Sequence, residues 1–176
     1  DSVLAGRKVL IILENLPLPF DRRVWQEARA LVAAGAVVSV ICPRAKGYEA
    51  PYEFLAGVHI HRHPLPLEAS GRFGFVLEYG VALFWQSWLA WRIFFGRGFD
   101  VIHGCNPPDL IFLVALPFKL LGRRFIFDHH DINPELYEAK FGRRGLLWRA
   151  MLWLERLTFA CADVSKATSA RCCCPK

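Results

Sequence analysis

The chain has 176 residues, of which 54% are hydrophobic and 22% charged, so it suits one folded domain and excludes an intrinsically disordered protein. Its net charge of +6 favours an anionic partner such as a membrane surface or a phosphate-bearing substrate, whereas no basic run or motif indicates nucleic-acid binding. Cys42, Cys105 and Cys161 lie singly in or beside apolar runs, which is typical of buried thiols and argues against a disulfide framework.

The first predicted elements form a βαβ unit. Residues 8–13 (KVLIIL) are a nearly continuous apolar run, which is typical of a parallel strand covered on both faces. Asp21 is expected to cap a helix that ends near Ala34, and residues 37–41 predict the next strand. The turn after the first strand lacks the glycine-rich fingerprint of nicotinamide- and flavin-binding domains, which argues against a dehydrogenase.

A polar connection and a histidine-rich strand come next. Residues 43–57 contain proline, glycine and polar side chains and predict a loop. The alternating residues 58–63 (VHIHRH) predict a strand at the edge of the sheet, with His59, His61 and His63 on one face. No carboxylate or cysteine accompanies these histidines in the sequence, so we interpret them as a polar strand face rather than a metal site.

Residues 75–99 are unusually rich in phenylalanine and tryptophan. As a helix this stretch is apolar on nearly every side, which is typical of a helix buried in the core of an α/β domain. The alternative is a segment that lies in a membrane interface, where tryptophan and arginine are both favoured. Glu78, Gln86 and Arg92 interrupt the apolar run, so it does not predict a membrane-spanning helix.

The second half of the chain repeats the alternation of strands and helices. Residues 100–103 predict a strand, and Asn106 is expected to cap a helix that continues to about Leu121. An amphipathic helix over residues 143–161 and a strand over residues 163–167 complete the pattern. This alternation predicts a doubly wound, mostly parallel sheet, an α/β fold of Rossmann-like type.

A polar cluster interrupts this second half. Residues 124–127 predict a short buried strand that breaks into the polar segment 128–131 (DHHD). A helix start follows, with Asn133 as the N-cap and Pro134 at the first helical position. A strand that ends in polar residues and turns into a helix is typical of the ligand-binding edge of an open α/β sheet.

Three motifs resemble one known family: ENLPLPFDRRVWQEARALVAAG from residue 14, DVIHGCNPPD from residue 100 and FDHHDINPELYEAKFG from residue 127. Together they are similar to the N-terminal half of a glycosyltransferase of the GT-B fold, in particular to the retaining family 4 enzymes that assemble bacterial surface polysaccharides. The resemblance implies an acceptor-side domain over residues 1–170 and a frayed tail over residues 171–176. The donor-binding domain of such an enzyme is expected to lie outside these residues.

The resemblance also implies which residues form the site. The His-Asp pair typical of the family falls on His130 and Asp131, which are expected to be catalytic at the cleft beside the reacting sugar. His103 is expected to have a supporting role. The predicted substrate-binding residues are Asn15, Asp21, Arg22, Arg23, Asn106 and Asp128. No metal and no cofactor is implied, because helix dipoles and basic side chains neutralise the leaving diphosphate in this fold.

The implied activity is transfer of a sugar from a nucleotide-sugar, bound mainly by the other domain, to a saccharide acceptor on a membrane lipid. The expected location is the cytoplasm, with peripheral contact at the inner face of the membrane. A separate donor domain is an expected partner, and the isolated half is expected to be inactive alone. Two alternatives remain: a non-catalytic Rossmann-like module that binds a sugar, a phosphate or a partner domain, and a sugar-nucleotide epimerase of the same fold.

Overall fold

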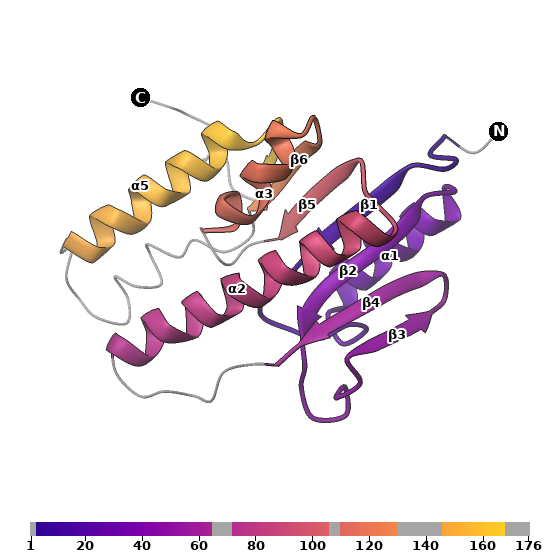
Figure 1. Cartoon of the computed structure of the whole chain (residues 1–176), viewed down its shortest axis with the longest axis horizontal. Helices are drawn as coiled ribbons and strands as arrows, with labels where there is room; N and C mark the ends of the chain where they lie inside the picture. Colours follow the sequence, from indigo (N-terminus) through magenta and orange to yellow (C-terminus); the bar gives the residue numbers. More distant parts are fainter. Residues whose placement is uncertain (1–2, 65–71, 106–109, 130–145, 168–176) are drawn as a thin grey trace.

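The computed structural model of the protein describes residues 3–64, 72–105, 110–129 and 146–167. These residues form a sheet of seven strands in the order β3-β4-β2-β1-β5-β6-β7, with helices on both faces (Figure 1). Every pairing in the sheet is parallel except that of β3 with β4. The prediction of a doubly wound, mostly parallel α/β sheet is confirmed.

The strands are β1 (Lys8–Ile12), β2 (Val37–Pro43), β3 (Tyr52–Leu55), β4 (Val58–His63), β5 (Val101–Cys105), β6 (Arg124–His129) and β7 (Val164–Ala167). The helices are α1 (Arg22–Ala33), α2 (Arg72–Gly96), α3 (Ile111–Leu120) and α5 (Leu146–Cys161). Helix α3 begins after a Leu110 N-cap that makes no side-chain capping bond. The predicted start of this helix at Asn106 lies outside the described residues.

Strand β3 lies in the segment that the sequence predicts as a loop. It pairs antiparallel with β4, so β3 forms the edge of the sheet and the prediction that β4 is an edge strand is wrong. The two strands are joined by Ala56 and Gly57, which both have positive φ angles, of 48° and 83°. This turn lacks the Asn-Gly or Asp-Gly pair that identifies such hairpins in a sequence, and four residues are too few for a clear alternation.

Strand β6 is longer than predicted. It does not break after Phe127, because Asp128 and His129 continue the sheet and pair with Lys166 and Ala167 of β7. Backbone hydrogen bonding to strands on both sides thus extends the strand into the polar segment. As a result, the Asp128 side chain belongs to the sheet rather than to the loop that follows it.

Each face of the sheet has its own hydrophobic core. Helix α1 covers one face, and its buried residues Val24 and Ala28 pack there against β1, β2 and β4. Helices α2, α3 and α5 cover the other face (Figure 1), where Phe118 contacts the rings of Phe99 and Trp91. Both faces of the central strands are therefore covered, as their continuous apolar runs predict.

Helix α2 is not buried on all sides, so the interpretation of residues 75–99 as a fully buried helix is wrong. Its inner face is buried, but Phe84, Trp88 and Phe95 are 63%, 56% and 78% exposed. A helix on the outside of a sheet covers it with one face only, whatever the composition of its other face. Among the helices of the described residues, none combines the length and the apolarity needed to cross a lipid bilayer.

Gly104 provides a test of the packing on β5. A methyl group at this position would lie 2.9 Å from Cγ1 of Ile111 and 3.2 Å from Cε2 of Phe125, closer than side chains normally approach. We expect Gly104→Ala to lower the free energy of unfolding by about 1–3 kcal/mol through overpacking, as measured by urea denaturation. The control is Gly80→Ala in α2, where the added methyl group meets nothing within 4 Å and should be neutral or stabilising. Equal stability of Gly104→Ala and the unsubstituted chain would contradict this packing.

Candidate functional site

The strand order places a candidate site at the carboxyl ends of β1 and β5. The chain moves outward from β1 to β2 and β4, and then returns to the other side of β1 as β5, β6 and β7. In open α/β sheets, ligands bind beside the carboxyl ends of the strands where the order reverses in this way. Here those ends are Ile12 and Cys105, and residues 13–21 connect β1 to α1.

Helix α1 begins at this edge with a capped first turn. Oδ1 of Asp21 accepts hydrogen bonds from the backbone N–H groups of Arg23 and Val24, both at 3.1 Å. This confirms Asp21 as the N-cap, and its negative charge stabilises the positive end of the helix dipole. The cap fixes the direction in which the first turn presents its two arginines.

Arg23 is bound to a buried carboxylate on the sheet. Its Nη1 donates to Oδ2 of Asp128 at 2.8 Å, which joins the first turn of α1 to the end of β6. The Asp128 side chain is fully buried, whereas that of Arg23 is 42% exposed. The ion pair therefore holds the guanidinium group at the edge of the sheet, and the Arg23 side chain as a whole is partly open to solvent.

His103 of β5 lies between two carboxylates. Its Nδ1 is 3.2 Å from Oε1 of Glu27, and its Nε2 is 3.8 Å from Oδ2 of Asp128. Burial lowers the pKa of His103, and the two neighbouring carboxylates oppose this shift without reversing it. The lowered pKa favours the neutral imidazole, and the short contact of Nδ1 with a carboxylate oxygen of Glu27 assigns the ring proton to Nδ1.

Cys105 lies beside His103 and Asp128, and all three side chains are of types that bind metal ions in proteins. Possible ligand atoms of His103, Cys105 and Asp128 all lie within 4.8 Å of one another. Burial raises the pKa of the Cys105 thiol far above its ordinary value, and Arg23 already occupies the carboxylate of Asp128. The arrangement therefore suits a hydrogen-bonded ionic cluster better than a cation site. We define the α1 cluster as Arg23, Glu27, His103, Cys105 and Asp128.

The structure brings together three of the residues predicted to bind substrate: Asp21, Arg23 and Asp128. Two further residues are exposed: Asn15, in the loop after β1, and Arg22, in the first turn of α1. Their roles in substrate binding stay predictions. The other predicted site residues, Asn106, His130 and Asp131, lie outside the described residues.

Glu27 was not predicted from the sequence. The signal that could have found it is its position four residues after Arg23, on the same face of the helix.

Comparison with known proteins gives the chain a family. Residues 21–172 match the family model described as Glycosyltransferase Family 4. None of the curated proteins compared with the chain matches it.

Two similar solved structures are crystal structures of the C-terminal domain of PF1911 hydrogenase from Pyrococcus furiosus, spanning residues 78–226 and 83–215 of that protein. The first has 16% sequence identity and a TM-score of 0.55, and the match covers 70% of this chain and 91% of that chain. The second has 16% identity and a TM-score of 0.54, with 71% and 95% covered. At this identity the likeness supports the fold alone.

Proposed function

Because the chain belongs to glycosyltransferase family 4, a family of retaining enzymes that use a nucleotide-sugar donor and a sugar acceptor, we propose that it is the acceptor-side half of a GT-B enzyme. The observation that carries this proposal is the family match over residues 21–172, which spans six of the seven strands and the whole α1 cluster. The reversal of strand order at β1 and β5 supports the same location for the site, at the carboxyl edge.

Arg23 is the described residue best suited to contact a substrate. Asp128 fixes the position of its guanidinium group, and its side chain is partly exposed at the positive end of α1. A phosphate or sugar hydroxyl could therefore accept hydrogen bonds from Arg23 while the ion pair stays intact. In this proposal Asp128 acts by positioning Arg23, because its own side chain is fully buried.

His130 and Asp131 are the proposed catalytic residues, on the strength of the family's His-Asp pair. They follow β6 directly in the chain, and β6 ends at the same edge as the α1 cluster. A histidine there can orient the acceptor hydroxyl or the transferred sugar. Asp131 can fix the tautomer of that imidazole or bind a sugar hydroxyl.

The proposed acceptor is a saccharide carried on a membrane lipid. Exposed aromatic side chains support contact with a membrane surface, because three large side chains of α2 and Trp153 of α5 are more than half exposed. The chain also carries a net charge of +6, which favours the anionic inner face of a membrane. A non-catalytic module that binds a sugar or phosphate is the second candidate, supported by the partly exposed Arg23.

A reconstitution assay tests the proposal. The 176-residue chain is mixed with a donor-binding domain from a family 4 relative, a panel of labelled nucleotide-sugars and lipid-linked saccharides. We expect labelled lipid-linked product with retained anomeric configuration only when both halves are present. Saturable saccharide binding without transfer in any mixture would favour the binding module instead. Epimerisation of the nucleotide-sugar would instead favour a sugar-nucleotide epimerase.

A further inference from the structure

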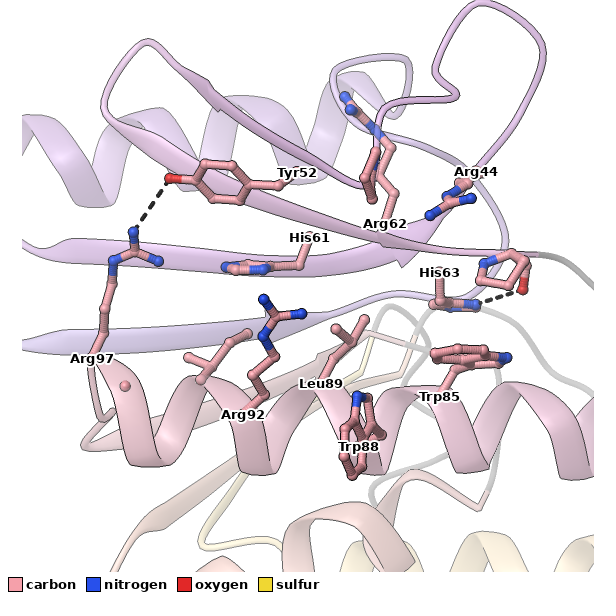
Figure 2. Close-up of a pocket in the computed structure, with 14 residues that line it drawn as sticks. Arg44, Tyr52, His61, Arg62, His63, Trp85, Trp88, Leu89, Arg92 and Arg97 are labelled. Carbon is pink, nitrogen blue, oxygen red and sulfur yellow. Dashed lines mark hydrogen bonds between the residues drawn. The ribbon is translucent and has the colours of Figure 1, made fainter.

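A pocket lies on the opposite face of the sheet from the α1 cluster. It has a volume of about 720 Å³ and is formed by α2 and the β3–β4 hairpin (Figure 2). Residues from four elements or their ends line it, including Arg92 and Arg97 of α2, His61 and His63 of β4, and Arg44 after β2. We call it the α2 pocket.

The α2 pocket is strongly basic. Four arginines line it, and no aspartate or glutamate does so among the residues that the structure describes. Arg62 is neutralised by Glu53, whose Oε2 lies 2.5 Å from its Nη2. Arg44, Arg92 and Arg97 have no carboxylate within 4.0 Å in the described part of the chain. Three positive charges around one hollow favour an anion inside it.

Two histidines that line the α2 pocket also have a buried imidazole nitrogen without a partner among the described residues. The His63 residue is only 1% exposed, and its Nδ1 is 3.1 Å from the carbonyl oxygen of Pro64, while Nε2 has no hydrogen-bond partner among the described residues. The Nε2 of His61 is likewise buried and unpaired in this part of the chain. Because buried polar atoms are normally satisfied, the unpaired nitrogen of His61 indicates a polar ligand group beside it.

The remaining wall of the α2 pocket is apolar and aromatic. Trp85, Trp88 and Leu89 of α2 line it (Figure 2). Arg97 is held against the hairpin, because its Nη2 donates to Oη of Tyr52 at 3.3 Å and its guanidinium lies over the Tyr52 ring. The pocket therefore combines anchored positive charge with a surface that suits an apolar or aromatic body.

We propose that the α2 pocket binds a phosphate group carried on an apolar or aromatic body, with the phosphate at Arg92 and Arg97 beside His61. Figure 2 shows Arg92 reaching from α2 toward His61 and Arg97 reaching toward Tyr52, with Trp85 farther along the pocket, where the body of the ligand would lie. A phosphate oxygen accepts two or more hydrogen bonds from guanidinium groups, which suits arginine better than lysine. This site is separate from the proposed transfer site and does not depend on it.

The electrostatics of His61 support the proposal and provide a measurement. Burial and then the charges of Arg97, His59 and Arg92 lower the pKa of His61 to about 4. The groups that face it are Tyr52 and His59 on the hairpin and the two arginines on α2. A bound phosphate adds negative charge beside the ring and favours the protonated form, so the pKa of His61 should rise on binding.

The experiment measures binding of inorganic pyrophosphate to the 176-residue chain, with the His61 resonances followed by NMR over a pH series. We expect saturable binding and a higher pKa of His61 with pyrophosphate in the unsubstituted chain. Arg92→Gln and Arg97→Gln should each weaken binding by about tenfold, the usual effect of one lost charge-assisted hydrogen bond. Arg29→Gln, which removes an exposed arginine from α1, is the control and should leave binding unchanged.

Vesicle flotation distinguishes the two sources of the phosphate. Flotation with phosphatidylglycerol vesicles that is lost in the Arg92→Gln/Arg97→Gln variant, but kept in an Arg7→Gln/Arg29→Gln variant, assigns the phosphate to a lipid. Pyrophosphate binding without flotation assigns it to a soluble ligand. An unchanged His61 pKa with saturating pyrophosphate would overturn the proposal, and this readout needs no variant to fold.

Discussion

Replacing His130 with alanine is expected to lower turnover of the enzyme, assembled with a donor-binding domain, by about 10²–10⁴-fold. The reason is that this imidazole is proposed to orient or exchange a proton with the reacting sugar at the carboxyl edge. The affinity for the nucleotide-sugar should stay nearly unchanged, because the proposed donor site belongs mainly to the other domain. Steady-state transfer rates, together with calorimetric measurement of nucleotide binding, check both parts.

The matched control is His59→Ala, which removes an imidazole from the amino-terminal part of β4. That side chain contacts Tyr52 and Phe54 on the hairpin and lies far along the strand from the carboxyl edge. It should leave turnover largely intact. If His130→Ala transfers sugar at the same rate as the control, the catalytic role assigned to this histidine is wrong.

Arg23→Met is expected to lower the free energy of unfolding by about 2–3 kcal/mol, because it removes a charged donor 2.8 Å from a fully buried carboxylate. Methionine keeps much of the aliphatic stem, so the effect reports on the lost charge more than on lost packing. Urea denaturation measures the change. The control is Arg22→Met in the same turn, which is exposed and forms no ion pair within the described residues, so its effect should be below about 0.5 kcal/mol.

A double-mutant cycle isolates the interaction itself. Asp128→Asn removes the buried charge while keeping the shape of the side chain, and the Arg23→Met/Asp128→Asn variant should then lose less stability than the two single losses added together. Strict additivity would show that the pair contributes nothing to folding.

The same variants also test function, because Asp128→Asn should weaken substrate contact through a displaced Arg23 even though Asp128 is buried.

Local patterns predicted the elements whose environment is uniform along their length. The apolar runs of β1 and β2 identify strands covered on both faces, and Asp21 identifies the start of α1 through a capping bond that needs only three neighbouring residues. In each case the physical cause lies within a few positions of the residue concerned.

Prediction from the sequence failed where a structural feature depends on residues that are distant in the chain. The extension of β6 through Asp128 and His129 depends on backbone pairing with β7, and no pattern within the segment indicates it. The exposed aromatic face of α2 results from the position of this helix on the outside of the sheet, which composition does not show. In the site, Arg23 and Asp128 were both predicted, but their contact was not, because side-chain types alone do not reveal which residues a parallel sheet brings together.

The pairing of Arg23 with Asp128 also has a consequence for how the chain folds as it leaves the ribosome. The two residues are 105 positions apart, so at about 5–20 residues per second the arginine emerges roughly 5–20 s before its carboxylate. During that interval β1, α1 and β2 can associate, but the anchor that orients the guanidinium does not yet exist. The proposed binding of an acceptor by Arg23 therefore becomes possible only late in synthesis of the chain, when β6 pairs with β5.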